Sequence, residues 1–223
     1  MKEKLEAAKA VLEKHGQEQL LANYEKLSEN DKDKLLDDIL TIDFNQLEKL
    51  YEKRNFKQVY SEAEIEPISY VEKDKMSKEE REKYDEIGTK AIKAGKLAAV
   101  TMAGGQGTRL GHNGPKGTFD IGLESHKPIF ELLCETLKLA NEKYGVVIPW
   151  YIMTSKENNK DTVDFFEKNN YFGYPKGYIQ FFKQGELPMV GEDGKVLLDE
   201  KGMIKQAADG HGGIFTSMRK DGV

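Results

Sequence analysis

The feature that most constrains the fold is a short apolar run that passes directly into a glycine-dense loop. Residues 97–102 read Leu-Ala-Ala-Val-Thr-Met, and residues 103–117 read Ala-Gly-Gly-Gln-Gly-Thr-Arg-Leu-Gly-His-Asn-Gly-Pro-Lys-Gly. A short apolar run bounded by turn residues is typical of a buried strand in a parallel sheet. The sequence therefore predicts a buried parallel strand followed by a loop whose glycines serve a special purpose.

Further strand and helix patterns follow this loop in alternation. A short extended piece is predicted over 119–123, and Pro128 suits the first turn of a helix that runs to about Lys143 and is ended by Gly145. Further strands are predicted over 146–153 and 178–182, with a helix over 158–168 between them and turns at 193–194 and 201–202. Alternation at this spacing favours an α/β fold, a sheet with crossover helices.

A different pattern occupies the beginning of the chain. Residues 1–60 are rich in Leu, Glu and Lys and predict a module of short helices, with N-caps at Ser28 and Asp43. Residues 61–95 predict a connecting segment, irregular around Pro67, and a helix that opens on a Ser77–Glu80 capping box and is ended by a left-handed Gly95. Residues 96–223 then form the α/β part. The helical module is interpreted as a packing appendage, with a partner-binding or regulatory module as the alternative.

Composition excludes several classes of function. The formal net charge is -5, so the chain offers no broad basic surface for nucleic acid. No apolar run approaches the ~18 to 20 residues that a membrane span needs, and residues 1–16 lack the apolar core of a secretory signal. The single cysteine, Cys134, cannot form an internal disulfide and is predicted to be a buried core residue. These features indicate a cytoplasmic protein.

The glycine-dense loop also carries two cations. Gly104, Gly105 and Gly107 are expected to adopt positive φ and to let the backbone approach a ligand, with successive amides pointing at phosphate oxygens. Arg109 adds a planar fork that binds phosphate in a bidentate manner, and Lys116 adds a point charge between Pro and Gly. Together they predict a polyphosphate clamp.

Other interpretations of these glycines explain less. Gly105, Gly107 and Gly111 satisfy a G-x-G-x-x-x-G dinucleotide pattern, but that pattern gives no reason for the nearby Arg109 and the Pro-Lys-Gly beyond it. A Walker A loop needs Gly-Lys-Ser/Thr in succession, whereas Lys116 follows proline and precedes glycine. A tight turn without a ligand would not explain two cations.

An ordered set of motifs extends the pattern over most of the chain. After residues 102–111 and 115–117 come Met-Thr-Ser at 153–155, Tyr-Phe-Gly at 171–173, Phe-Phe-Lys-Gln-Gly-Glu-Leu-Pro at 181–188 and Ala-Asp-Gly-His-Gly-Gly at 208–213. In order and spacing this set resembles the eukaryotic-type UDP-sugar pyrophosphorylases, and among them the UDP-N-acetylhexosamine pyrophosphorylases. The resemblance implies a nucleotide-diphospho-sugar transferase fold, Rossmann-like and GT-A-like, with a mixed sheet.

The same resemblance implies roles for individual residues. The loop 103–107 would contact uracil and wrap the triphosphate, Arg109 would hold the β- and γ-phosphates, and Lys116 would hold the α-phosphate. Gln184 and Gly210 would contact uracil, and His211 would lie near the sugar or the α-phosphate. The expected substrate-binding residues are Ala103, Gly104, Gly105, Gly107, Thr108, Gln184, Gly210 and His211, and the expected catalytic residues are Arg109 and Lys116.

The implied reaction joins UTP and a sugar-1-phosphate into a UDP-sugar and pyrophosphate. The attacking phosphate is already anionic, so positioning and charge stabilisation should dominate, and Mg²⁺ is expected as a further neutraliser. The sequence identifies no metal ligands and no oligomeric state.

Two departures from the family pattern leave alternatives open. Acetylhexosamine members usually have asparagine where this chain has His211, and a histidine there is more similar to UDP-glucose pyrophosphorylases, so glucose-1-phosphate and galactose-1-phosphate are alternatives. Family members also continue well past the Asp-Gly-x-Gly-Gly segment. We therefore expect an N-terminal part of a longer enzyme that lacks most of its sugar pocket and is inactive alone. A non-catalytic UTP-binding module is the alternative from another class.

Overall fold

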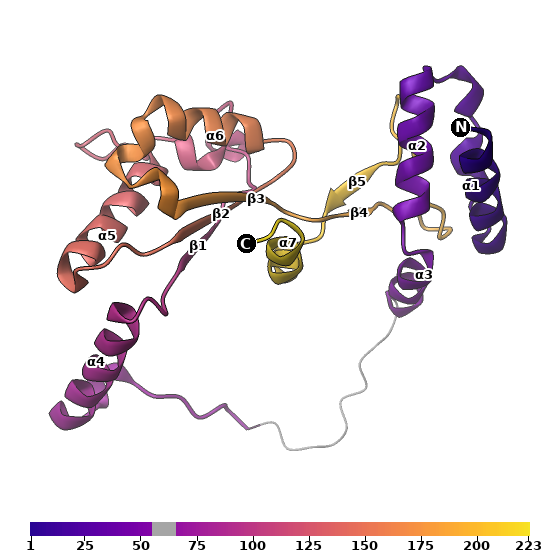
Figure 1. Ribbon diagram of the computed structural model, residues 1–223. Helices are drawn as coiled ribbons and strands as arrows, with labels where there is room; N and C mark the ends of the chain where they lie inside the picture. Colours follow the sequence, from indigo (N-terminus) through magenta and orange to yellow (C-terminus); the bar gives the residue numbers. More distant parts are fainter. Residues whose placement is uncertain (55–65) are drawn as a thin grey trace. The chain divides into compact units, whose positions relative to one another are not determined.

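The computed structural model describes residues 1–54 and 66–223, which form two compact units (Figure 1). One unit combines Met1–Ile65 with Glu186–Ala208, and the other combines Glu66–Gly185 with Asp209–Val223. The chain thus leaves the α/β unit after Gly185 and returns to it at Asp209. Residues 55–60 of the predicted helical module and 61–65 of the predicted connecting segment lie outside the described residues.

The first unit is built on three helices, α1 (Lys2–His15), α2 (Glu29–Thr41) and α3 (Phe44–Lys53). The predicted caps are confirmed, since the Ser28 side chain accepts a hydrogen bond from the Asp31 amide and Asp43 accepts one from the Gln46 amide. Between α1 and α2 the chain forms two short 3-10 turns, Glu18–Leu21 and Tyr24–Lys26. The helices bury one apolar face each around a shared core, whose helical members are Ala8, Leu12, Leu20, Tyr24, Leu35, Leu36, Ile39 and Phe44.

An antiparallel arm formed by Glu186–Ala208 completes this unit. Strands β4 (Glu186–Pro188) and β5 (Gln206–Ala208) are antiparallel, and isolated bridges continue the pairing toward turns at Gly194 and Gly202, both with positive φ. Val196 and Ile204 from this arm are buried in the core of the helices. The predicted turns are therefore confirmed, and the segment between them belongs to the helical core.

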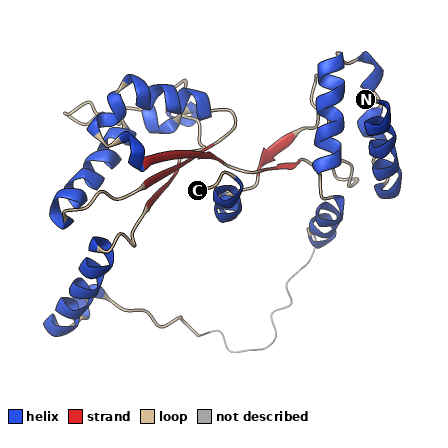
Figure 2. Ribbon diagram, viewed as in Figure 1, coloured by secondary structure: helices blue, strands red, loops and turns tan. Residues whose placement is uncertain are grey.

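The second unit contains a three-stranded parallel sheet in the order β1-β2-β3 (Figure 2). Its strands are β1 (Ala99–Met102), β2 (Trp150–Thr154) and β3 (Ile179–Lys183), with Ala99 paired to Trp150 and Trp150 paired to Ile179. Helix α5 (Ile129–Tyr144) connects β1 to β2, and α6 (Asn159–Lys168) connects β2 to β3. This confirms the predicted α/β class with crossover helices.

Helices α5 and α6 pack on the sheet face presented by Trp150 and Ile152 (Figure 1). Cys134 on α5 is fully buried there, as predicted, together with Phe130 and Phe166. The prediction that β1 is buried is only partly met: Ala99 and Thr101 are half-buried on one face, because successive side chains of a strand point to opposite faces. Val100 and Met102 are 43% and 51% exposed on the other face.

Two helices flank this sheet in the sequence. Helix α4 (Lys78–Lys93) opens on the predicted Ser77–Glu80 capping box, and Gly95 after it has the predicted left-handed conformation with φ of 69°. Helix α7 (Ile214–Lys220) contacts β3. Between them, Gly145 ends α5 with φ of 66°, which confirms the predicted stop.

Candidate functional site

The three parallel strands deliver three loops to one edge of the sheet. Strand β1 ends at Met102, β2 at Thr154 and β3 at Lys183, so the glycine loop, the turn at Ser155 and Gln184 all follow carboxyl ends. The pairing continues briefly beyond the strands, because the Ala103 amide donates to Met153 O and the Gln184 amide to Thr154 O, each at 2.7 Å. Ligands of open α/β sheets bind at this edge.

The glycine loop folds back on itself. The Gly107 amide donates to Gly114 O at 2.9 Å, and the Lys116 amide donates to Gly105 O at 3.0 Å, so that residues 106 and 115 form an antiparallel bridge. His112 fastens this fold, because its Nε2 lies 2.7 Å from Thr118 Oγ1. The Thr118 hydroxyl donates to Pro115 O at 2.8 Å. It therefore accepts from His112, whose Nε2 carries the proton.

The glycines of the loop act through close approach. Gly104, Gly105 and Gly107 do not have positive φ, so the predicted left-handed backbone is wrong for all three. Instead, a β-carbon at Gly104 would lie 2.7 Å from Gln184 Oε1, and one at Gly107 would lie 2.8 Å from the His112 ring. The loop is packed so tightly that two of these positions lack room for a side chain, which sequence periodicity cannot reveal.

Several amides of the loop are left without an acceptor. Among the described residues, the backbone N–H groups of Gly104, Gly105, Gln106 and Thr108 donate to no protein oxygen. Backbone amides grouped in this way can bind an anion. Thr108 begins a short 3-10 turn, Thr108–Leu110, that Gly111 ends with φ of 69°.

The two predicted cations are exposed and free. Neither Arg109 nor Lys116 forms a side-chain hydrogen bond or ion pair with any residue the structure describes. The Lys116 side chain lies along the loop, with Nζ 3.9 Å from the position of a β-carbon on Gly105. Both charges are thus available to an anionic ligand.

A second Pro-Lys-Gly in the chain provides an internal comparison. Residues 175–177 form the same kind of proline-capped 3-10 turn as residues 115–117. Lys176, however, lies 3.6 Å from Glu167 and 5.0 Å from the centroid of the Tyr171 ring, and these neighbours raise its pKa. The same tripeptide thus carries a lysine paired with a carboxylate in one place and an unpaired one in the glycine loop.

Gln184 joins the predicted uracil-contacting residues. Its side chain is buried, with Nε2 donating to Gly210 O at 3.0 Å and Oε1 facing Gly104. Gly210 has φ of 79°, a conformation that favours glycine. His211 begins a 3-10 turn, His211–Gly213, and is exposed. The structure therefore brings Gly104, Gln184 and Gly210 together and leaves His211 at the surface of the same segment.

Asp209 is a residue that the sequence prediction passed over. A β-carbon on Gly185 or on Gly213 would lie within 2.3 Å of its Oδ2, so the carboxylate is wedged between two backbone segments. Its Oδ1 is buried and has no hydrogen-bond partner among the described residues. Asp209 requires glycine at both position 185 and position 213. The sequence contains these two glycines, but their role is clear only when the structure brings the two segments together.

The described residues do not offer a protein-built metal site. They contain no group of three His, Cys, Asp or Glu side chains that could surround an ion. The donor set therefore does not fit a cage of protein ligands. Mg²⁺ usually binds through one or two carboxylates together with substrate phosphates.

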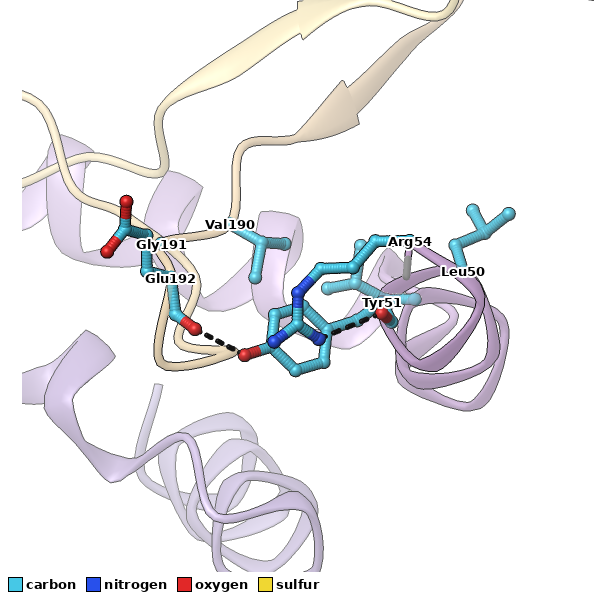
Figure 3. A pocket seen from close by; sticks show the side chains of 7 residues that line it. Leu50, Tyr51, Arg54, Val190, Gly191 and Glu192 are labelled. Carbon is cyan, nitrogen blue, oxygen red and sulfur yellow. Dashed lines mark hydrogen bonds between the residues drawn. The ribbon is translucent and has the colours of Figure 1, made fainter. Parts of the chain in front are cut away.

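A pocket in the first unit contains no residue of the glycine loop. It has a volume of about 680 Å³ and is lined by Leu47, Leu50, Tyr51, Arg54, Val190, Gly191 and Glu192 (Figure 3). Arg54 stacks on the Tyr51 ring with its guanidinium carbon 3.5 Å from the centroid, and the Tyr51 hydroxyl donates to Glu192 O at 2.5 Å. Three of its lining residues are aliphatic and it lacks a buried, unpartnered polar group, so it does not suggest a polyphosphate site.

Comparison with known families assigns the chain. The model of the family described as UTP–glucose-1-phosphate uridylyltransferase matches residues 43–223, a range that includes the whole glycine loop and Gln184. The chain belongs to this family. The described part of the chain includes no helix that is long and apolar enough to span a membrane.

Individual relatives are named for N-acetylglucosamine chemistry. A UDP-N-acetylglucosamine diphosphorylase 2 of Arabidopsis thaliana and a UDP-N-acetylglucosamine pyrophosphorylase of Saccharomyces cerevisiae are each 37% identical over 93% and 92% of this chain. The chain covers 44% and 46% of those proteins, and thus spans less than half the length of the curated relatives it matches.

A solved structure agrees with these relatives. The uridine diphosphate N-acetylglucosamine pyrophosphorylase of Trypanosoma brucei matches 98% of this chain with a TM-score of 0.72 and 28% identity, over 45% of its own length. A structure described as a UDP-N-acetylglucosamine pyrophosphorylase of Entamoeba histolytica matches 63% of the chain at 37% identity with a TM-score of 0.57. The resemblance found in the sequence motifs is therefore confirmed.

Proposed function

We propose that this chain binds UTP and supplies the nucleotide-binding part of a UTP:sugar-1-phosphate uridylyltransferase. The observation that carries the proposal is the glycine loop at the carboxyl edge of the sheet, with its unpaired amides and the two free cations Arg109 and Lys116. Family membership and the N-acetylglucosamine names of the relatives support UDP-N-acetylhexosamine as the product.

In the proposed reaction, a phosphate oxygen of the sugar-1-phosphate attacks the α-phosphorus of UTP in line. A new P–O bond forms there as the bond to the β-phosphate oxygen breaks, and pyrophosphate leaves with the electron pair. Both reactants are anions, so the loop amides, Arg109 and Lys116 would act by positioning and charge stabilisation. Mg²⁺ is proposed to arrive with the triphosphate, and the cytoplasm is proposed as the compartment.

Gln184 supports a preference for uracil. One N–H of its Nε2 donates to Gly210 O, and its Oε1 faces Gly104, where it can accept a hydrogen bond. Uracil has an N–H at ring position 3, whereas cytosine has a lone pair there and would face Oε1 with a second acceptor. Because an unsatisfied buried acceptor costs about 1–3 kcal/mol, CTP should bind roughly 5- to 150-fold more weakly than UTP.

Isothermal titration of the 223-residue chain with UTP, CTP, ATP and GTP tests the proposal. Uridine preference supports it, and equal or absent binding of all four contradicts it. A pyrophosphate-release assay with N-acetylglucosamine-1-phosphate, N-acetylgalactosamine-1-phosphate, glucose-1-phosphate and galactose-1-phosphate then tests the sugar.

One observation favours a second product. His211 occupies the place where the acetylhexosamine members have asparagine, and it lies exposed at the glycine-rich segment that Gln184 contacts. UDP-glucose or UDP-galactose is therefore the alternative product. Faster pyrophosphate release with glucose-1-phosphate or galactose-1-phosphate than with the two acetylated sugars would select it. Uridine binding without any release is the result expected both for an inactive part of an enzyme and for a non-catalytic UTP-binding module.

A further inference from the structure

Asn158 is a fully buried polar residue next to the glycine loop. It lies immediately before α6, in the turn that follows β2. Its Oδ1 accepts a hydrogen bond from the Ser155 backbone amide at 2.9 Å, and its backbone N–H donates to Ser155 Oγ at 3.0 Å. The bond to Oδ1 orients the side chain so that its amide nitrogen Nδ2 faces the loop.

The Asn158 amide nitrogen binds two carbonyl groups of the glycine loop. Nδ2 donates to Ala103 O at 3.0 Å and to Gly105 O at 3.4 Å. A side-chain amide has two N–H groups, so one asparagine can serve both carbonyls. Gly105 O also accepts the Lys116 amide, and this links Asn158 to the segment that carries the lysine.

The geometry of the peptide bond turns this contact into control of the loop amides. In a planar trans peptide, the carbonyl and the N–H of the next residue point in opposite directions. The carbonyl of Ala103 points at Asn158, so the N–H of Gly104 points away from it. By the same reasoning, the N–H of Gln106 points away because the carbonyl of Gly105 is held. Neither N–H has an acceptor among the described residues.

We infer that Asn158 is a positioning residue for nucleotide binding, which holds the Gly104 and Gln106 amides in the orientation that receives the nucleotide. This inference rests on the proposed function for the identity of the ligand. The orientation of the loop itself is a property of the ligand-free chain and is tested separately.

Asn158→Asp is the most informative substitution because it is nearly isosteric. Oδ1 still accepts the Ser155 amide, but a carboxylate oxygen replaces Nδ2 and faces the carbonyl oxygens of Ala103 and Gly105. At neutral pH the loop loses both hydrogen bonds and meets a repulsive charge. Burial beside two carbonyl oxygens raises the pKa of such a carboxyl, and once it is protonated at lower pH its O–H can donate to one of the carbonyls again.

The control is Asn141→Asp on α5. Asn141 uses the same chemistry, since its Oδ1 accepts the Ile148 amide at 3.0 Å and its Nδ2 donates to the Tyr174 hydroxyl at 3.0 Å, and it contacts no residue of the glycine loop. Asn158→Ser is a second test variant, because serine suits the start of a helix but is too short to reach Ala103 O.

Hydrogen exchange of the ligand-free proteins and titration with UTP are measured for each variant. We expect the hydrogen-bonded loop amides, those of Ala103, Gly107 and Lys116, to exchange faster in both Asn158 variants and not in Asn141→Asp. We expect UTP to bind roughly 10- to 100-fold more weakly to the Asn158 variants, as for the loss of a hydrogen bond to a charged group. The loss in Asn158→Asp should shrink relative to the wild-type protein as the pH is lowered from 7.5 to 5.

Unchanged loop exchange in both Asn158 variants would overturn the inference, whatever the nucleotide result. Faster loop exchange with unchanged UTP affinity would also overturn it, because the loop would then be positioned for something else. If the wild-type chain bound no nucleotide while loop exchange responded as expected, the proposed function would fail and the inference for UTP with it, whereas the contact between Asn158 and the loop would stand.

Discussion

The sharpest structural prediction concerns Gly117, the last residue of the loop. Gly117 is the middle residue of the 3-10 turn Lys116–Thr118, and its φ is outside the left-handed region, so the backbone itself would accept alanine. A β-carbon there would lie 2.2 Å from Cε2 and Cζ of Phe130. Carbon atoms in contact are normally about 3.5–4.0 Å apart. Alanine therefore requires the ring or the turn to move by about 1.5 Å.

The Phe130 ring cannot move freely. It is 1% exposed, and its centroid is 4.9 Å from that of Phe166 and 6.5 Å from that of Phe165. Overpacking of a well-packed core costs about 1–3 kcal/mol. In a chain of this size each kcal/mol lowers the Tm by roughly 2–4 °C, so Gly117→Ala should lower the Tm by roughly 2–12 °C.

Scanning calorimetry measures this effect, and the chain contains a matched control. Gly177 is the middle residue of the other Pro-Lys-Gly turn, and a β-carbon on it would meet no atom within 4 Å. Gly177→Ala should leave the Tm within about 2 °C of the wild-type value, as is usual for surface substitutions.

A double-mutant cycle tests the cause. Phe130→Leu removes the two closest clashing atoms, Cε2 and Cζ, so Gly117→Ala should cost less in that background, with a coupling energy of about 0.5–3 kcal/mol. Equal Tm values for Gly117→Ala and Gly177→Ala, or additive effects of Gly117→Ala and Phe130→Leu, would refute the packing argument.

Three further predictions follow from the contacts of single residues. Lys116→Ala should weaken UTP binding by roughly 10- to 100-fold and lower any turnover by about 10²- to 10³-fold. Lys176→Ala is the control and should leave the affinity for UTP, measured by titration, unchanged. Equal effects of the two substitutions would contradict the role of Lys116 in the polyphosphate clamp. Burial raises the pKa of Cys134 to about 11, so Ellman's reagent at pH 8 should react with the unfolded protein and not with the native one. The Gly122 amide and His126 lower the pKa of Asp120, so its stabilising contribution is present above the ordinary value of 3.8 and is lost as the pH falls through the lower folded-state pKa. The Tm advantage of the wild-type protein over Asp120→Asn should therefore shrink below pH 3.8, and a constant difference would count against that contact.

Features encoded by neighbouring residues could be predicted from the sequence. The capping box at Ser77 and the left-handed Gly145 are signals within one helical turn, and both are found in the structure. The ends of the strands were less accurate, because β2 begins at Trp150 although the apolar pattern starts at Val146. The hydropathy pattern indicates which residues are buried, whereas the first and last residues of a strand depend on the length of the strands paired with it.

Conformations maintained by tertiary packing could not be predicted. Asn170, Tyr171 and Phe172 all have φ near +50°, and Gly173 continues this left-handed turn. Each non-glycine residue costs about 1–2 kcal/mol in this conformation. The Tyr171 and Phe172 rings pack on Phe166, and this contact offsets the cost.

The candidate site shows the same division. Its cations and glycines could be found in the sequence because they are close together along the chain, but Asn158 lies 53 residues from Gly105, to which it is bonded. The Pro-Lys-Gly pattern is also insufficient alone, because it occurs twice with the same local turn. The neighbours of each lysine decide its use: Lys176 has a carboxylate and an aromatic ring beside it, whereas Lys116 has a loop of unpaired amides. A lysine is most available to a ligand where the fold has not already paired it with a carboxylate, and the local sequence motif does not show whether such a partner is present.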